Sequence, residues 1–514
     1  MSTKDRCFTI GLDCGTGSAR ALIADSAGNV LAMATSDYAT QHPHPGWATQ
    51  KPEEWWSAAC EAVRTVIVEA GVDPSRISAI CADGTSSTLV GLTDSLEPVA
   101  DAILWMDNRA SVEARQIEAT RHPVLRRSRA GVSAETALPK IMWLKKNEPA
   151  LYKRTRWFVE MADYIALRLS GRLTHGQNLT INRWFYDPRN GGWPVDFLDA
   201  IGLEDIAGKF PEEMPALGDP IGPVTSATAK AMGLTTDTLV VAGGTDAYVA
   251  MVGLNTLRPG ETALITGTSH LVLPVVAEDE EIEGLFGPHP DCVTRGTFVM
   301  EGGQVSSGAI LRWWHDLLQE ESRSDGYEAL IREAQAAPQG AHGLIVLDFW
   351  QGNRNPYTDY DLMGAVWGLT LKHRRAEITR ALMEAVALGT ANILNRLTDR
   401  GIEVKNMTLA GGVLRSPFWA QMHADATGTV LRIPVIGEAS AFGAAIAAGV
   451  GAGLHPSLEE AADKMVRIET EIQPDMDRHA KFREQMKLYL DTYEVLRPLM
   501  HQQAARNREA LVSS

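Results

Sequence analysis

The segment Asp13–Ser18 (DCGTGS) combines a carboxylate with a turn of glycines and hydroxylated side chains. Gly15 and Gly17 allow backbone N–H groups to face one point, and Thr16 and Ser18 add hydroxyl donors. Asp13 ends an apolar run, where its carboxylate can hold Mg²⁺ directly or through water. The pattern indicates a seat for phosphate and metal, although a plain hairpin turn uses the same residue types.

Gly267, Thr268 and Ser269 repeat this arrangement in the second half of the chain. Two such turns facing each other across a cleft would clamp a polyphosphate from both sides, although each alone also fits an ordinary turn. Gly411 and Gly412 follow a strand-like run and can bring backbone close to an adenine or a ribose. The sequence has no GxxxxGK[ST] motif, which argues against a P-loop NTPase.

Asp246 follows the apolar run 239–242 and the glycines Gly243 and Gly244. A carboxylate at the end of a buried strand can orient a substrate hydroxyl and accept its proton as a phosphate ester forms. The alternative is a helix N-cap, because Asp before an apolar helical run caps well. The local sequence does not separate the two interpretations.

A third group of polar residues follows two other strand-like runs. Carboxylates grip paired hydroxyls and an indole covers a C–H face, so this mixture suits a polyhydroxylated ligand. Taken singly, each residue also fits a structural role. The group consists of Asp83, Thr85, Trp105, Asp107 and Arg109, and Glu301 is similar.

The elements that must position these residues can be outlined from hydrophobic patterning. The runs 8–13 and 19–24 flank the first turn and predict a hairpin, with a third strand at 30–34. Pro52 and the carboxylates after it predict a helix over 52–70. Strands are expected at 77–81, 239–242, 261–266 and 271–276. The run-turn-run pattern occurs twice, so we expect two similar halves with a boundary near residues 254–260.

Composition excludes several classes of protein. The chain has 514 residues, of which 45% are hydrophobic and 22% charged, as in a globular protein. Its net charge of −16 disfavours general binding to nucleic acid or to anionic membranes. The five cysteines are scattered and the histidines show no zinc-site spacing. With no signal-like segment at the start and no apolar run long enough to span a bilayer, we expect a cytoplasmic protein.

Taken together, these motifs resemble the FGGY family of carbohydrate kinases, from about Phe8 to Leu454. No single motif is specific, but their order and spacing together are. The motifs are Asp13–Ser18, Pro52–Trp55, Trp105–Arg109, Gly244–Asp246, Gly267–Ser269, Glu301–Gly302, Gly352–Tyr357, Gly411–Gly412 and Glu438–Gly443.

The resemblance implies an α/β fold of two actin-like (ribonuclease-H-like) ATPase domains around a central cleft. The N-terminal domain would comprise residues 1–254 and hold the sugar and the catalytic base. The C-terminal domain would comprise residues 255–514 and bind ATP, ending in a helical tail. The implied cofactors are ATP and Mg²⁺.

The resemblance also implies roles for individual residues. Asp246 would be the catalytic base, and Asp13 and Asp246 would lie by the metal, through water. The expected nucleotide and phosphate contacts are Asp13, Gly15, Thr16, Ser18, Gly267, Thr268, Ser269, Gly308, Gly411, Gly412 and Ser416. The expected sugar contacts are Asp83, Gly84, Thr85, Trp105, Asp107, Asp246 and Glu301.

Within the family, the segments 15–20 and 105–110 look most like those of pentulose kinases, and so do 133–145 and 301–304. The segment Asp83–Thr85 differs from the Gln-Met-His of typical xylulokinases and the Gln-Arg-Glu of glycerol kinases, and Arg312 stands where glycerol kinases have Gln. We therefore expect a kinase of the ribulokinase or xylulokinase type. The resemblance assigns no role to Arg183 or Arg312.

The expected reaction is ATP-dependent phosphorylation of a ketopentose on its terminal hydroxyl, giving the pentulose 5-phosphate and ADP. One alternative is a kinase for a polyol or another ketose. The other, from a different class, is a non-enzymatic actin-like sugar sensor or chaperone ATPase. The expected partner is a small sugar, with no nucleic acid or membrane, and a homodimer is possible.

Overall fold

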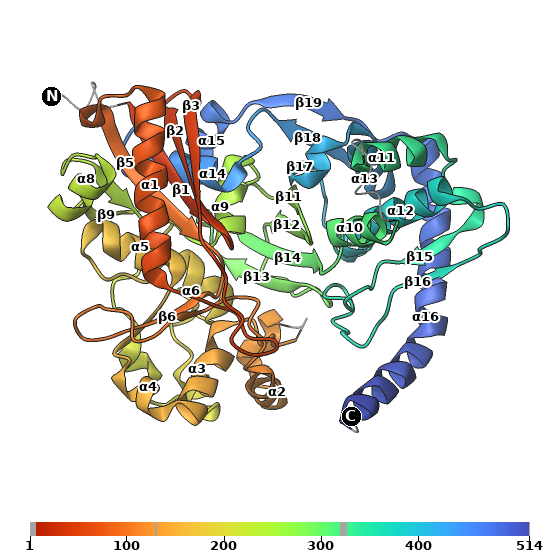
Figure 1. The fold of residues 1–514 in the computed structure, drawn as a ribbon, viewed down its shortest axis with the longest axis horizontal. Helices are drawn as coiled ribbons and strands as arrows, with labels where there is room; N and C mark the ends of the chain where they lie inside the picture. Colours follow the sequence, from red (N-terminus) through yellow and green to blue (C-terminus); the bar gives the residue numbers. More distant parts are fainter. Residues whose placement is uncertain (1–6, 129–130, 319–325, 513–514) are drawn as a thin grey trace.

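Two large β-sheets organise the molecule in the computed structural model, which describes residues 7–128, 131–318 and 326–512. In Figure 1 the first sheet lies among red and yellow elements and the second among green and blue ones. The first has the order β3 (Val30–Asp37), β2 (Ser18–Asp25), β1 (Phe8–Cys14), β5 (Ile77–Gly84), β10 (Leu239–Val241) and β9 (Pro220–Pro223). The second has the order β13 (Phe286–Pro290), β14 (Phe298–Gln304), β12 (His270–Val276), β11 (Glu261–Thr266), β17 (Asn406–Gly411), β18 (Val430–Pro434) and β19 (Ile468–Ile472).

Both sheets are built around the same local arrangement of three strands. In the first, β1 pairs with β2 as an antiparallel hairpin and with β5 in parallel. In the second, β11 pairs with β12 as a hairpin and with β17 in parallel. The hairpins predicted from the flanking apolar runs are thereby confirmed, and the two Gly-Thr turns lie at equivalent ends of the two sheets.

Two smaller sheets and a set of helices complete the fold. The small sheets contain β4 (Thr49–Gln50), β7 (Ala102–Ile103), β6 (Leu89–Leu92) and β8 (Trp157–Glu160), and β15 (Ile345–Leu347) with β16 (Ala365–Trp367). The helices of the first half are α1 (Pro52–Ala70), α2 (Ser111–Ala119), α3 (Ala137–Asn147), α4 (Pro149–Arg154), α5 (Met161–Ser170), α6 (Gln177–Arg183), α7 (Val195–Ala200), α8 (Ser226–Met232) and α9 (Asp246–Gly253). Those of the second half are α10 (Gly308–Leu317), α11 (Gly326–Ala336), α12 (Arg375–Thr398), α13 (Pro417–Thr427), α14 (Ala439–Gly451), α15 (Leu458–Met465) and α16 (Met476–Val512).

Helix α1 shows how closely local sequence sets an element. Pro52 occupies the first turn with Glu53 and Glu54, where a carboxylate favours the positive end of the helix dipole. Gly71 ends the helix in the left-handed region, with φ of 61°, and its N–H donates to the carbonyl of Val68. The prediction of a helix over 52–70 is confirmed.

Helices α9 and α14 pack against each other at the centre of the molecule without intervening side chains. A Cβ atom on Gly443 would lie 2.0 Å from the carbonyl oxygen of Val249, and one on Gly253 would lie 2.1 Å from that of Ala439. Only glycine permits this approach at either position. The surrounding core takes residues from both halves of the sequence, including Leu22 of β2 and Ala263 of β11.

The C-terminal helix α16 extends well beyond the rest of the molecule in Figure 1. Its first part packs against the second half of the chain, where the hydroxyl of Tyr489 donates to Asp348 over 2.7 Å. None of the helices in the described ranges combines the length and apolar character that a membrane crossing requires.

Candidate active site

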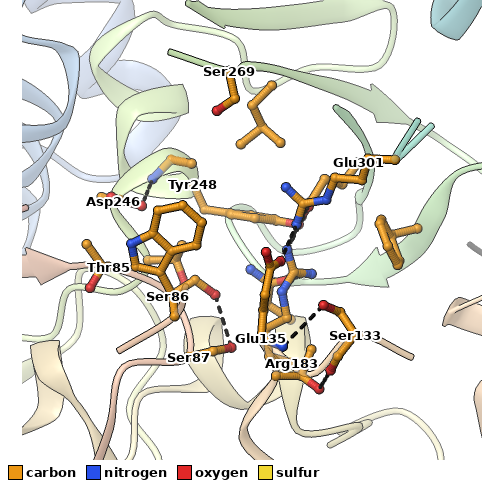
Figure 2. A pocket seen from close by; sticks show the side chains of 18 of the residues that line it. Thr85, Ser86, Ser87, Ser133, Glu135, Arg183, Asp246, Tyr248, Ser269 and Glu301 are labelled. Carbon is orange, nitrogen blue, oxygen red and sulfur yellow. Dashed lines mark hydrogen bonds and ion pairs between the residues drawn. The ribbon is translucent and has the colours of Figure 1, made fainter. Parts of the chain in front are cut away.

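A cavity of about 330 Å³ lies between the two large sheets and is lined from both halves of the chain. Figure 2 shows Asp246, Thr85 and Ser86 on one side of it, Glu301 and Arg183 on another, and Ser269 above them. The volume is at the lower end of the range for small-molecule sites. Of the residues expected from the sequence, the cavity is lined by Thr16, Thr85, Trp105, Asp246, Gly267, Ser269 and Glu301.

The backbone between β10 and α9 packs closely against β5, and this contact positions Asp246. A Cβ atom on Gly243 would lie 1.9 Å from the carbonyl oxygen of Ala82, so glycine is required there. Thr245 occupies the N-cap position and Asp246 is the first residue of the helix. The alternative in which Asp246 is the cap is therefore wrong, and its carboxylate, which accepts only a 2.7 Å bond from the N–H of Ala247 among the described hydrogen bonds, lies on the cavity wall.

A cluster of carboxylates surrounds this position. Asp13 of β1 and Asp83 of β5 are direct partners in the parallel register, and Arg20 pairs with Asp13 over 3.1 Å. Burial, and then the charge of Asp13, raises the pKa of Asp246 to about 7. Burial, and then the charge of the neighbouring Asp13, also raise the pKa of Asp83. Neither Asp13 nor Asp83 is among the cavity-lining residues.

The first Gly-Thr turn closes the β1–β2 hairpin. The N–H of Gly15 donates to the carbonyl of Ser18 over 3.0 Å. Thr16, at the tip of the turn, lines the cavity and accepts a 3.1 Å bond at its hydroxyl from the indole N–H of Trp105. Of the expected phosphate contacts in this turn, Thr16 therefore reaches the cavity, whereas Gly15 and Ser18 support the hairpin.

The second Gly-Thr turn is packed closely by glycines from neighbouring elements. A Cβ atom on Gly308 would lie 2.3 Å from the carbonyl oxygen of Gly267, and one on Gly411 would lie 1.8 Å from that of Thr266. Gly412, by contrast, faces open space. The hydroxyl of Ser416 accepts from the N–H of Trp419 and caps α13.

Thr268, in the middle of this turn, lines a separate hollow with Ala309, Arg312 and Trp313. This hollow belongs to the second half of the chain and joins the turn to α10. Arg312, to which the resemblance assigned no role, thus lies beside one of the predicted nucleotide contacts.

Glu301 forms the opposite wall of the cavity, in a network that local sequence did not reveal. Arg183 of α6 donates to both carboxylate oxygens of Glu301, over 2.6 and 2.7 Å, and the hydroxyl of Tyr248 donates over 3.0 Å. Arg354 approaches within 3.8 Å. Burial alone would raise the pKa of Glu301, but Arg183 and Arg354 outweigh it and hold the pKa at about 2.

The remaining expected sugar contacts divide between the wall and its support. Thr85 and Trp105 line the cavity. Asp107 is fully buried, accepts a 2.6 Å bond from the N–H of Ala48 and pairs with Arg109 over 2.7 Å, so its oxygens are engaged away from the cavity. Gly84 donates its N–H to the carbonyl of Gly244 and joins β5 to the passage that precedes Asp246.

The donor set fits a hard cation held jointly with phosphate. Asp13 and Asp246 offer oxygen ligands, and Arg20 is the cation paired with this group. Within the described ranges, no three His, Cys, Asp or Glu side chains are placed to hold a metal by themselves. Mg²⁺ commonly keeps several waters and takes other ligands from substrate phosphates, so such an incomplete protein site suits it.

The fold and site together define a sugar phosphotransferase with two actin-like domains around a cleft. Models of the N-terminal and C-terminal domains of the FGGY family of carbohydrate kinases match residues 8–253 and 262–452. The chain belongs to the FGGY family of carbohydrate kinases, enzymes that use ATP as the phosphate donor.

Several of the similar proteins are named as kinases of pentuloses. A ribulokinase of Anoxybacillus flavithermus is 29% identical over 510 residues, which cover 90% of each chain. A xylulose kinase of Staphylococcus epidermidis is 26% identical over 501 residues, covering 95% of this chain and 97% of that one. The crystal structure of a xylulose kinase from Rhodospirillum rubrum superposes with a TM-score of 0.86 at 26% identity, covering 96% of this chain and all of the other.

Proposed function

We propose that this kinase phosphorylates a ketopentose of the ribulose or xylulose type on its terminal hydroxyl, giving the pentulose 5-phosphate and ADP. The observation that carries the proposal is the cavity itself, with Asp246 on one wall and the Glu301–Arg183 pair on the other. Asp246 offers a base for the hydroxyl of the substrate, and the Glu301–Arg183 pair offers charged groups for the rest of a short, polar sugar. The ribulokinase and xylulokinase names of its relatives support the same class.

We further propose that residues 1–254 and 255–514 act as two domains that close on the substrates. The sugar would bind mainly to the first domain, against Thr85, Trp105 and Asp246, with Glu301 completing the pocket. ATP would bind mainly to the second, near Gly267–Ser269, Gly308 and Gly411–Ser416. The position of the second turn supports this assignment, because Gly267 and Ser269 line the cavity and Thr268 lines the hollow beside it.

In the proposed mechanism Asp246 accepts the proton of the terminal hydroxyl while that oxygen bonds to the γ-phosphorus of ATP. The bond between the γ-phosphorus and the bridging oxygen breaks, and ADP leaves with the electron pair. Because phosphoryl transfer has a loose transition state, most of the catalysis is alignment and charge neutralisation. Asp246 aligns the acceptor, and the closed cleft excludes water that would compete with it.

Mg²⁺, when bound, would neutralise charge on the polyphosphate. Asp13 and Asp246 would hold it, through water. Arg20, paired with Asp13, limits the negative charge of the group before the metal arrives.

We also propose that the enzyme is cytoplasmic. The five cysteines are all free thiols, which suits that reducing compartment.

An ADP-release screen tests the proposal. The purified enzyme with ATP and Mg²⁺ is given the four stereoisomers D- and L-ribulose and D- and L-xylulose, beside hexuloses and pentitols, and the product is located by NMR. We expect one or two pentuloses to be turned over with the highest kcat/KM and to carry phosphate on carbon 5. Preference for a pentitol or hexulose would establish the alternative kinase and reject the pentulose assignment.

A further inference from the structure

Lys140 is a fully buried lysine in the first turn of α3, where electrostatics does not favour a cation. The N-terminus of a helix carries partial positive charge, so lysine there gains nothing from the helix itself. Lys145 and Lys146 of the same helix lie in its last turn, where the dipole favours them. Burial lowers the pKa of Lys140 to about 7, although Asp107, Glu135 and Glu160 act to raise it. A function outside the helix is needed to account for this residue.

The ammonium group of Lys140 makes three hydrogen bonds, all to backbone carbonyls that lie outside α3. Nζ donates to the carbonyl of Ser87 over 2.7 Å, to that of Leu104 over 2.8 Å and to that of Glu135 over 2.8 Å. An ammonium has three donors and no acceptor, so its hydrogen-bonding capacity is completely used. Neither a neutral side chain of the same length nor an apolar one can satisfy all three carbonyls.

Each of these carbonyls belongs to a segment that forms the cavity wall. Ser86 and Ser87 line the cavity, Leu104 immediately precedes the lining residue Trp105, and Glu135 lines it directly. Figure 2 shows Ser87 and Glu135 on the same side of the cavity. The loops at Ser87 and Leu104, which lie 53 and 36 positions from Lys140, and the segment just before α3 therefore meet at one buried cation behind the pocket.

Ser87 shows that the wall is held against a local conformational preference. Its φ of 56° lies in the left-handed region, which is unfavourable for a residue other than glycine. The peptide groups on both sides of Ser87 are fixed, since its N–H donates to Glu160 over 2.6 Å and its carbonyl accepts from Lys140. Such conformations persist where the surroundings over-determine them.

The three segments also lead to the groups that the proposed reaction uses. The indole N–H of Trp105 donates to the hydroxyl of Thr16 in the first phosphate turn. The carboxylate of Glu135 meets Arg354 over 3.5 Å, and Arg354 approaches Glu301. A shift of the wall would therefore be felt at both ends of the cavity.

We propose that Lys140 is a positioning residue that sets the shape of the sugar subsite by holding three of its wall segments through their backbone carbonyls. The proposal rests on the proposed function only in taking this cavity as the sugar site. It predicts that Lys140 governs sugar binding while leaving nucleotide binding to the other half of the chain.

The test compares Lys140→Met, which keeps length and removes every donor, with two control variants on the same helix. Lys146→Met removes a lysine of the same helix that is 59% exposed, and Ile141→Ala opens the buried core behind α3 without touching the carbonyls. For Lys140→Met we expect the sugar KM to rise about tenfold or more while the ATP KM stays within about twofold. Lys146→Met should match wild type, and Ile141→Ala should lower the melting temperature with a near-normal sugar KM.

A folded Lys140→Met enzyme with a wild-type sugar KM would overturn the proposal, as would equal rises in both KM values that Ile141→Ala reproduces. If Lys140→Met does not fold, Lys140→Gln takes its place, because its amide keeps two donors. A raised sugar KM in that variant supports the proposal and an unchanged one rejects it. The measurements use whichever sugar the wild-type enzyme turns over best in the panel. A wrong pentulose assignment would therefore show in the wild-type screen itself and would not affect the comparison of the variants.

Discussion

At the scale of single residues, Asp246 carries the proposed chemistry and gives the sharpest prediction. Asp246→Asn keeps the size of the side chain but cannot accept a proton, so we expect kcat to fall by about 10²-fold or more. The ATP KM should change little, because in the proposed arrangement the nucleotide binds mainly to other residues. Steady-state kinetics with a thermal melt is the measurement, and a stable variant with normal kcat would remove Asp246 from catalysis.

The same residue sets an expected pH dependence. Its pKa is raised from 3.8 to about 7, so the carboxylate that can act as a base forms only as pH rises through that region. We therefore expect kcat/KM for the sugar to increase from about pH 6 to pH 8. The pKa of Asp246 is higher in the folded protein than in the unfolded chain, where it is about 3.8. Its contribution to the free energy of unfolding is therefore fully present below about pH 3.8 and is lost as the pH rises through 7.

Glu160 is the control for this profile, because burial also raises its pKa to about 7. A Glu160→Gln enzyme removes that titration but keeps Asp246, so the rising limb should persist in it. If the rising limb disappeared in Glu160→Gln, the pH dependence of kcat/KM would be due to Glu160 and not to Asp246.

A thermal melt of Asp246→Asn gives a second check. Its melting temperature at pH 8 should equal or exceed that of wild type, since a neutral amide avoids the buried charge.

Local sequence predicted some of these residues and not others for a physical reason. The Gly-Thr turns and Asp246 are marked by glycines and apolar runs within a few residues of them. The pair of Arg183 with Glu301 is made by groups 118 positions apart, so no local spacing announces it. Asp107 has the residue type of a sugar ligand, and only the fold shows that Ala48 and Arg109 engage its oxygens.

At the scale of elements, the α9–α14 contact controls where Asp246 lies, because α9 begins at that residue. Gly443→Ala would place a methyl group 2.0 Å from the carbonyl oxygen of Val249, so the helices must separate. We expect a loss of about 1–3 kcal/mol in the free energy of unfolding, as for other overpacked cores, together with a lower kcat. Denaturant unfolding and steady-state kinetics measure the two effects.

Gly208→Ala is the matched control, since a Cβ atom there meets nothing within 4 Å. It should leave both stability and kcat near wild type. If Gly443→Ala behaved like Gly208→Ala, the tight crossing of the two helices would not be important for the position of Asp246. The small residues of 439–451 permit this close packing, but local sequence does not show that the partner is the helix at whose start Asp246 lies.

At the scale of the whole molecule, groups from both halves meet around the cavity. Arg126 of the first half pairs with Asp279 of the second over 3.4 Å, and Glu135 meets Arg354. We expect the halves to close further when both substrates are present, because sugar and nucleotide would then bridge them. Small-angle scattering should give a smaller radius of gyration with the sugar and a non-hydrolysable ATP analogue together than with neither.

Each ligand alone is the control for this measurement and should produce a smaller change than the pair. Superposable profiles in all four conditions would argue against closure of two domains. The arrangement of two sheets could be expected from the repeated run-turn-run pattern. The way in which the halves meet could not be predicted in this way. Their ion pairs and the glycine contacts between α9 and α14 join positions that are far apart in the sequence.

The position of α14 has a consequence for how the protein is made. This helix is encoded late in the chain but packs against β1 and β5 of the first sheet as well as against α9. A ribosome adds about 5–20 residues per second, so roughly 10–40 seconds separate the synthesis of α9 from that of α14. During that interval the nascent first sheet has an uncovered apolar face, and a chaperone that shields it would raise the yield of native enzyme.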